Sequence, residues 1–492
     1  MFAVLNLNIS HLTITPSKLD ASRSLPKWVI VPLYSAVLLV PCFWQSRIQS
    51  ADLASHIYNA WLASQIHRGP VAGLWISPQR TNVLFDDMLE WSLVRLSPDW
   101  AQRIAVSICV LIFGWGMVQF LFRVSRTNWW FAGPCVAMLA YGFVFHLGLF
   151  NFYLSLGICL CYLSLTWASP HWERYILGSP LLLLAWTAHP LPVLWAIATA
   201  AYAVVASRIS PRRKIVVPAV AAAGLVSLRF FLTYRFPCNW SFAQVFYALG
   251  ANQIVLFGWK YALPFTALLV IWAVSLRTLI KRDGALRVIS SIPFQLCLLN
   301  ALAVVLIPRS VMLPEFARPL NYITERLSLL TAVMVCAVLG APGMNHLIKA
   351  ALVSTAILFF AFVYLDQRDL NTMEDRLDAA LSRLPAGARV IGNLSSPSLR
   401  SLCLYHQMDR ACVEHCYSYA NYEPSSRQFR VRAAANNGIV LNDTADVDAV
   451  AEGRYVAHSR DLPAYLIYEC GQNLNLICSR PLKAGELNKT WH

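Results

Sequence analysis

Charged side chains are scarce in this sequence. Only 13% of its 492 residues are Asp, Glu, Lys or Arg, whereas 57% are hydrophobic. Because soluble globular domains carry about 25% charged residues, this shortage excludes an ordinary soluble protein. The N-terminus also lacks a long apolar core followed by a small-residue cleavage site, which argues against a secretory signal peptide. We therefore expect a polytopic membrane protein whose first apolar run is an uncleaved anchor.

Acidic residues are the rarer charge. The chain has 25 Asp and Glu against 40 Lys and Arg, which gives a net charge of +15. Much of this excess lies in short loops between apolar runs, where basic residues fix the orientation of a membrane protein. We therefore expect no nucleic-acid partner. Internal repeats and low-complexity segments are absent as well, and a transporter often shows internal symmetry.

Eleven apolar runs approach the roughly 17–25 residues that a membrane-spanning helix needs. They are Trp28–Trp44, Ile104–Phe122, Trp129–His146, Phe152–Ala168, Tyr175–Ala188, Leu191–Ser207, Ile215–Leu232, Ala262–Ile280, Val288–Pro308, Leu327–Leu339 and Leu347–Leu365. The fifth and sixth runs are separated by His189-Pro190, which predicts a helix break. With eleven spans, the basic loops all fall on one side, which the positive-inside rule makes cytoplasmic. The N-terminus is then cytoplasmic and the C-terminus extracytoplasmic.

The composition predicts two domains. Residues 1–365 form an α-helical polytopic membrane domain of about 11 transmembrane helices with a long outer loop, residues 46–102. From residue 366 the composition becomes that of a soluble module, and residues 366–492 are expected to form a small extracytoplasmic α/β domain. Its elements are an amphipathic helix, Asp369–Leu384, and strands at Ala388–Ile391, Gly438–Leu441, Tyr455–His458, Ala464–Tyr468 and Leu476–Arg480.

The outer loop carries the residues with the clearest chemistry. Read as a helix, Asp52, Ser55, His56 and Asn59 share one face, which predicts a helix that lies on a membrane surface. An acid next to hydrocarbon is costly unless it is used, so we expect Asp52 to deprotonate or orient an acceptor hydroxyl. His56 would share a metal ion with Asp52 or bind the acceptor.

Two more acids follow in the same loop. Asp86 and Asp87 are candidates for a second acid, but adjacent helical residues diverge by about 100°, so only one of them should face the site. His146 and His189 fall at the outer ends of spans and are expected either to line the same cavity or to cap helices. The alternative for Asp86 and Asp87 is a solvated turn, which would use the same residues.

Five cysteines lie in the C-terminal segment. Cys470 and Cys478 bracket a turn-prone segment and predict a hairpin closed by a disulfide, because an extracytoplasmic compartment is oxidising. His406, Cys412, His415 and Cys416 allow a zinc site as an alternative, but Cys-x-x-x-Cys spacing alone is unspecific.

The architecture resembles the GT-C superfamily of polyprenyl-phosphate-sugar-dependent membrane glycosyltransferases. The resemblance covers the whole chain, and Asp52 matches the family's first acidic motif. It implies transfer of a sugar from a polyprenyl-phosphate donor to a glycan, lipid or protein acceptor at the outer face of an inner or plasma membrane. It also implies that Arg318 and Arg326 bind the donor phosphate and that a divalent cation, Mg or Mn, can serve as cofactor. The alternatives are a transporter or flippase of lipid-linked material, or a non-catalytic membrane protein.

Overall fold

The computed structural model describes residues 27–69, 71, 73–125, 129–210, 216–340, 345–392, 394, 402–471 and 476–487. The chain divides into two compact units, Met1–Val37 and Leu38–His492. The described part of the first unit is the beginning of helix α1 (Lys27–Phe43). All the other elements belong to the second unit.

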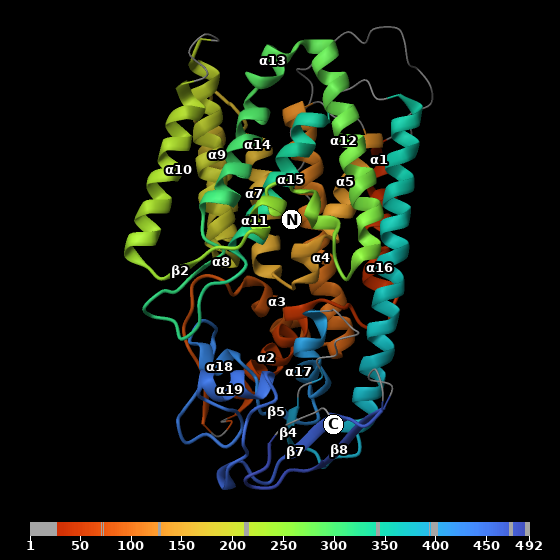
Figure 1. The fold of residues 1–492 in the computed structure, drawn as a ribbon, viewed down its shortest axis with the longest axis vertical. Coiled ribbons are helices and arrows are strands. Elements are labelled where there is room, and N and C mark those ends of the chain that lie inside the picture. The colour runs from red at the N-terminus through yellow and green to blue at the C-terminus, as the bar shows by residue number, and fades with distance from the viewer. Residues whose placement is uncertain are drawn as a thin grey trace. The chain divides into compact units, whose positions relative to one another are not determined.

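Helices make up most of the second unit (Figure 1). Up to residue 235 they are α2 (Ala51–Arg68), α3 (Leu84–Leu93), α4 (Pro98–Ser125), α5 (Trp129–Ala140), α6 (Phe143–His146), α7 (Phe150–Thr166), α8 (Glu173–Ala188), α9 (Pro190–Arg208) and α10 (Val216–Arg235). They continue with α11 (Ala243–Tyr247), η3 (Ala251–Ile254), η4 (Trp259–Tyr261), α12 (Ala262–Asp283), α13 (Ala285–Ile289), α14 (Ile292–Leu306), α15 (Ile323–Leu339) and α16 (His346–Leu381).

The apolar helices support a helical membrane protein. Within the described residues, five helices are long and apolar enough to cross a membrane: Pro98–Ser125, Pro190–Arg208, Val216–Arg235, Trp259–Asp283 and His346–Leu381. Four more apolar helices are shorter, with 10–17 residues. Each of the eleven apolar runs contains helix, but the number of eleven spans stays a prediction.

The predicted break between two of the runs is present. Helix α8 ends at Ala188 and α9 begins at Pro190. Pro190 fits the first helical position because the N–H that it lacks would have no partner there. The Nδ1 atom of His189 accepts a hydrogen bond from the Leu191 N–H, so this histidine is the N-cap of α9.

Helix α16 joins two elements that the sequence separates. Its 36 residues contain the expected last span and most of the amphipathic helix Asp369–Leu384. The segment Asp366–Arg368 has no proline or glycine that would interrupt the helix. The domain division expected at residue 366 therefore falls inside a continuous helix.

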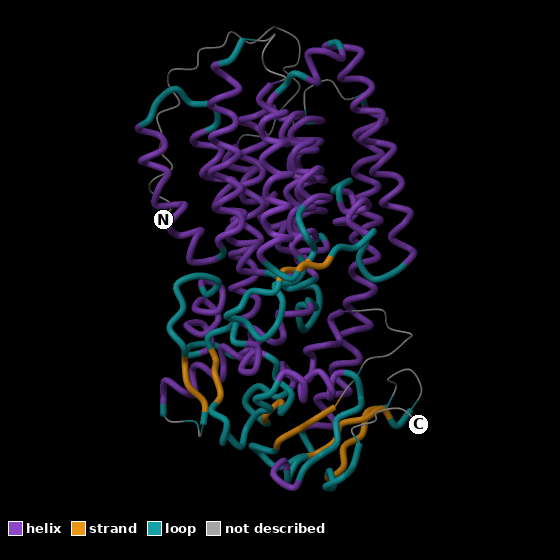
Figure 2. The backbone as a smooth tube through the Cα atoms, turned by 60° about the vertical axis from the view of Figure 1, so that its left-hand side comes forward, coloured by secondary structure: helices purple, strands orange, loops and turns teal. Residues whose placement is uncertain are grey.

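The C-terminal segment contains helices and a small mixed sheet. Its helices are η5 (Leu402–His406), α17 (Gln407–Ala411), α18 (Glu423–Ser426), α19 (Thr444–Ala451) and η6 (Ser459–Asp461). The sheet has the order β5 (Tyr417–Ser418), β4 (Arg389–Gly392), β7 (Tyr465–Glu469), β8 (Ile477–Pro481), with only the β7–β8 pair antiparallel. Figure 2 shows these strands in orange, grouped beyond the ends of the long helices.

Two of the five strands predicted from the sequence are not formed. Residues 438–441 form a loop, because the side-chain oxygen of Asn437 accepts the N–H groups of Ile439 and Val440 that a strand would pair. Near Tyr455–His458 the structure has only an isolated bridge between Val456 and Leu487. The expected hairpin is formed by β7 and β8, and Cys470 and Cys478 are joined in a disulfide beside it.

The outer loop and the C-terminal segment share one hydrophobic core. Tyr58 and Leu62 of α2 pack in the same cluster as Leu377 of α16 and Val390 of β4. Strand β1 (Leu74–Ile76) of the loop pairs with β6 (Val431–Ala433) of the C-terminal segment, and β2 (Cys238–Asn239) pairs with β3 (Ser310–Val311) elsewhere. The C-terminal segment is therefore built onto the first outer loop.

Helix α2 is confirmed as a helix, and protein covers both of its faces. Its polar residues Ser55, His56 and Asn59 are buried, as are Leu53 and Ile57 on the opposite face. On the polar face, Ser55 contacts Glu423 and Asn59 contacts Asn421 of the C-terminal segment. The position of α2 at a membrane surface stays a prediction.

A buried ion pair ties the C-terminal segment to α16. Arg410 donates to both carboxylate oxygens of Glu374, at 2.6 and 2.5 Å, and also to the carbonyl of Ile48 at 2.8 Å. Gln49 donates to Glu374 as well, at 2.7 Å. The Glu374 side chain is fully buried. This cluster therefore links the end of α16, α17 and the segment just before α2.

Replacing Arg410 should destabilise the protein strongly. Arg410→Met removes the two short hydrogen bonds to the buried Glu374 carboxylate and leaves only Arg47, 3.9 Å away, as its cation. Breaking a buried ion pair costs up to about 3–5 kcal/mol. The matched control is Arg368→Met, because Arg368 pairs with Asp369 on the surface, where such pairs contribute about 0–1 kcal/mol. Thermal unfolding of the purified protein should show a clearly lower midpoint for the first variant only. Equal midpoints would contradict the structural role given to Arg410.

Candidate functional site

Polar side chains from both ends of the chain meet at the polar face of α2. Asp52 and His56 come from α2, Asp86 from α3 and Asn151 from α7. His406, Asp409, Tyr422, Glu423 and Arg430 come from the C-terminal segment. Two contacts in this group join residues more than 350 positions apart. They are the contact of Asp52 with His406 and that of Ser55 on α2 with Glu423.

The turn before α7 holds the beginning of α2. The backbone N–H of Asp52 donates to the carbonyl of Leu147 at 3.2 Å. Gly148 has φ +80, and a Cβ atom there would lie 2.5 Å from the Asp52 nitrogen. Both the backbone conformation and this close approach require glycine. Asp52 is thus fixed in the first turn of α2, where the helix dipole favours a carboxylate.

Asp52 is the accessible carboxylate of this cluster. Its side chain is 28% exposed, compared with 12% for Asp86 and 6% for Asp409. Nε2 of His406 lies 3.6 Å from its Oδ1. A substrate could therefore reach Asp52, whereas the other acids of the cluster are covered.

A chain of hydrogen bonds positions His406. Its Nδ1 lies 3.0 Å from Oδ2 of Asp409, and Ser418 donates to the other oxygen of Asp409 at 2.5 Å. The His406 ring lies against Tyr422, with 4.9 Å between ring centroids. An imidazole held at Nδ1 by a carboxylate presents Nε2 in a defined direction, here toward Asp52.

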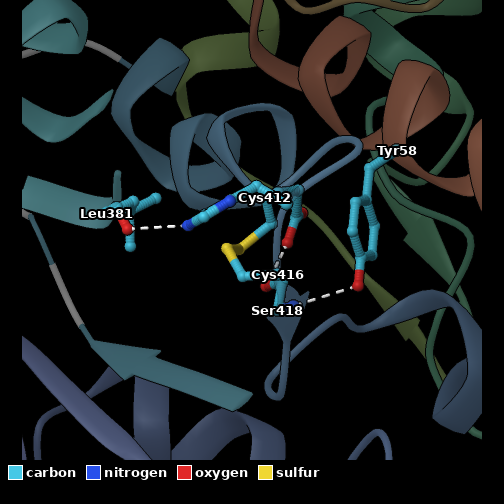
Figure 3. The surroundings of a disulfide bond; sticks show 7 residues. Tyr58, Leu381, Cys412, Cys416 and Ser418 are labelled. Carbon is cyan, nitrogen blue, oxygen red and sulfur yellow. Dashed lines mark hydrogen bonds between the residues drawn. A yellow bond between two sulfur atoms is a disulfide. The ribbon is translucent and has the colours of Figure 1, made fainter. Parts of the chain in front are cut away.

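The disulfide between Cys412 and Cys416 stabilises the loop that carries this chain (Figure 3). Just beyond it, the backbone N–H of Ser418 donates to the hydroxyl of Tyr58 at 2.9 Å. His415 binds the carbonyl of Leu381 at 2.9 Å. Cys412, Cys416 and His415 are thus occupied in a disulfide and a backbone contact, and the zinc alternative for them does not hold.

His56 and Asp86 form a buried pair. Nδ1 of His56 lies 2.6 Å from Oδ1 of Asp86, and the Asn151 amide donates to Oδ2 at 2.8 Å. Burial alone would lower the pKa of His56, but Asp86 raises it to about 9. Burial alone would raise the pKa of Asp86, but the attraction of His56 lowers it. The pair is therefore charged at neutral pH, and His56 contacts Asp86 instead of sharing a ligand with Asp52.

Glu423 is a buried acid that favours its neutral form. It is 3% exposed, and Ser55 lies within 3.4 Å of its Oε1. Burial and the nearby Asp86 raise its pKa to about 8, although His56 and Arg430 act in the opposite direction. A neutral carboxyl group can donate as well as accept a hydrogen bond at pH 7.

Asp87 contacts Arg430 at the edge of the cluster instead of facing α2. Arg430 contacts both Asp87 and Glu90 at 2.8 Å and donates to the backbone carbonyl of Asp86 at 3.2 Å. Of the two adjacent acids, only Asp86 faces α2, as the helical geometry predicts. Asp87 instead helps to attach the C-terminal segment to α3.

The two arginines predicted to bind phosphate differ in their surroundings. Arg326 is close enough to Asp52 to interact with it electrostatically, and its Nε atom has no hydrogen-bond partner among the described residues. Glu325 also acts on Arg326 electrostatically, but its carboxylate is shared with Arg309, which it binds at 2.8 Å. Arg318 lies with its Cζ 5.9 Å from the Tyr422 ring centroid but is paired with Asp448 at 2.6 Å.

The two histidines predicted to line a cavity have structural contacts. The ring of His146 is buried, with its nitrogens 3.2 Å from the Gly142 carbonyl and 3.3 Å from the Gln367 amide. His189 caps α9, and its ring packs edge-on against the Phe152 ring. The guanidinium of Arg326 lies over the same Phe152 ring. The structure therefore shows His189 as a helix cap and His146 in contact with a backbone carbonyl and an amide. Whether either histidine also lines a cavity with Asp52 stays a prediction.

A dedicated metal site is not formed by the described residues. No group of three or more His, Cys, Asp or Glu side chains among them is arranged to hold a metal ion. Asp86 is engaged by His56 and Asn151, so it does not converge with Asp52 on one ion. The Mg or Mn cofactor that the resemblance implies stays a prediction.

Several residues of the site were not predicted. Asp409, Tyr422 and Glu423 carry no local motif, and His406 was considered only as a zinc ligand.

Comparisons with protein-family models, curated proteins and solved structures find no match to this chain. The function must therefore be inferred from the geometry.

Raising the pH should weaken the folded state through this cluster. A group whose pKa is raised by folding stabilises the protein fully below its unfolded pKa and loses that contribution as pH rises through its folded pKa. For Glu423 this interval is 4.5 to about 8, and for His56 it is 6.5 to about 9. Thermal unfolding midpoints measured between about pH 7 and 9, where both groups still lose their contribution, should decline in the wild type.

Glu423→Gln should make this decline shallower, because the substitution removes one of the two titrating groups while keeping the side-chain size. Glu452→Gln is the control, because Glu452 is exposed and pairs with Arg454 on the surface. The unfolding midpoint of this variant should decline with pH as steeply as that of the wild type. If the unfolding midpoint of the Glu423→Gln variant fell with pH as steeply as that of the wild type, the raised pKa given to Glu423 would be wrong.

Proposed function

We propose that this protein is a GT-C-like integral membrane glycosyltransferase that transfers a sugar from a polyprenyl-phosphate donor to an acceptor. In this proposal the chain has eleven spans, a cytoplasmic N-terminus and an extracytoplasmic C-terminal segment in an inner or plasma membrane. The cluster at α2 then lies on the extracytoplasmic side, just beyond the apolar helices. The acceptor is a glycan, a lipid or a protein.

The observation that carries the proposal is the position of Asp52. It is the accessible acid in a group of buried carboxylates, and it has a histidine on one side and an incompletely paired arginine near it. The buried pair of His56 and Asp86 and the neutral Glu423 fix the helix that bears it. Such rigid support is typical of catalytic side chains that must be held in a productive geometry.

The reaction follows from these charges. As the acceptor oxygen bonds to the anomeric carbon of the sugar, its proton passes to the Asp52 carboxylate. The bond between that carbon and the phosphate oxygen breaks, and the electron pair leaves with the polyprenyl phosphate. Arg326 neutralises the charge that grows on this phosphate, because a guanidinium binds phosphate oxygens in a bidentate manner. His406 limits the directions that the Asp52 side chain can take.

Asp52→Asn should abolish most of the transfer activity. An amide cannot accept the proton, and general base catalysis contributes about 100-fold or more to the rate. Release of polyprenyl phosphate from a panel of synthetic polyprenyl-phosphate sugars, followed by mass spectrometry, measures the reaction in reconstituted vesicles. Glu315→Gln, an exposed carboxylate of another loop, should keep full activity.

The same vesicles separate the alternative functions. Donor that crosses the bilayer intact, without release of polyprenyl phosphate by the wild type, would indicate a transporter or flippase. Full activity of the Asp52 variant would remove this residue from the mechanism.

Arg326→Gln should weaken binding of the donor. Loss of a charged hydrogen bond to phosphate costs about 1.5–3 kcal/mol, so the KM for the donor should rise about 10- to 100-fold. Arg80→Gln is the control, because Arg80 is exposed on the first outer loop. An unchanged KM for the Arg326 variant would place the phosphate elsewhere.

A further inference from the structure

A cavity opens between α7, α8 and α9 at the ends of these helices that are remote from Asp52. Its volume is about 440 Å³, within the range of about 300–1,000 Å³ that is typical of ligand sites. The opposite end of α8 contacts the outer loop, because the N–H of Val83 donates to the carbonyl of Thr187. With 16 residues in α8, the two ends are about 24 Å apart.

The walls of this cavity are apolar. Ile197, Ala201, Val204 and Val205 of α9 line one side, and Tyr162 of α7 lines another. Neighbouring side chains of α8 and α9 point away from the protein, since Leu183 is 71% exposed and Leu194 is 58% exposed. In a membrane these surfaces contact hydrocarbon, so the cavity is continuous with a lipid-facing side of the bundle.

The rim of the cavity is polar and carries one positive charge. Arg208, at the end of α9, is the one charged residue among those that line the cavity. It is exposed and forms no ion pair with the described residues. It lies close enough to the Tyr175 hydroxyl to interact with it electrostatically. Trp172 also lines the rim and is 66% exposed, as is typical of aromatic residues at a membrane interface.

The beginning of α8 does not add a positive site to the rim. Glu173 lies in its first turn, and the backbone N–H groups of Arg174 and Tyr175 are bonded to the carbonyls of His171 and Trp172. The cavity therefore combines an apolar interior with one arginine at its edge.

We propose that this cavity binds an anionic glycerophospholipid of the surrounding membrane, with an acyl chain between α7 and α9 and the headgroup phosphate at Arg208. The apolar walls require a hydrocarbon chain, and the unpaired Arg208 requires a negative headgroup. The site is separate from the cluster at Asp52, and the proposal does not depend on glycosyl transfer.

Native mass spectrometry of the full-length protein in detergent tests the proposal, with dioleoyl phosphatidylglycerol and dioleoyl phosphatidylcholine as probes. Both lipids carry a phosphate, but the choline cation makes the phosphatidylcholine headgroup neutral overall. The wild type should therefore retain phosphatidylglycerol about fivefold better, which is the effect expected of one arginine near a headgroup with a net negative charge. In Arg208→Gln this preference should disappear. Arg174→Gln is the matched control, because Arg174 lies in the first turn of α8 but does not line the cavity.

A second variant tests the apolar part of the site. Ala201→Trp places a large side chain in the cavity and should reduce retention of both lipids, while the unfolding midpoint stays near that of the wild type. Equal retention of the two lipids by the wild type would overturn the proposal. An equal loss in the Arg174 variant, or unchanged retention in the Ala201 variant, would overturn it as well.

Discussion

The burial of the polar face of α2 is the constraint on which the structure of the site depends. A buried polar group that lacks a partner costs about 1–3 kcal/mol, so each side chain on this face needs a matching group. Asp86 supplies one for His56, Asn421 for Asn59 and Glu423 for Ser55. The pairings of Asn59 and Ser55 attach the outer loop to the C-terminal segment. Asp52 remains as the accessible acid at the end of the covered face.

The elements that the sequence predicts well are those with local signals. The 3.6-residue spacing of Asp52, His56 and Asn59 correctly predicts α2, and His189-Pro190 correctly predicts the break between α8 and α9. The adjacency of Asp86 and Asp87 also predicts that only one of them faces α2. In each case the physical rule acts over a few residues, so the sequence contains the necessary information.

The rest of the site depends on contacts between distant segments. Residues 417–433 have no signal that predicts pairing of β6 with β1 or the placement of Glu423 near His56. The strand expected at residues 438–441 fails because the Asn437 side chain takes the backbone N–H groups. Likewise, the amphipathic pattern of α2 does not reveal which partner covers its polar face. Tertiary packing decides these features.

In the proposed reaction, a sugar phosphate binds between Asp52 and Arg326. The decisive experiment is a structure of the full-length protein with a non-hydrolysable polyprenyl-phosphonate analogue of the donor. The anomeric carbon should lie close to Asp52, with room for an acceptor oxygen about 3–3.5 Å from that carbon, and the phosphonate should contact Arg326. An analogue bound away from α2, or one whose phosphonate contacts neither Arg326 nor Arg318, would contradict it.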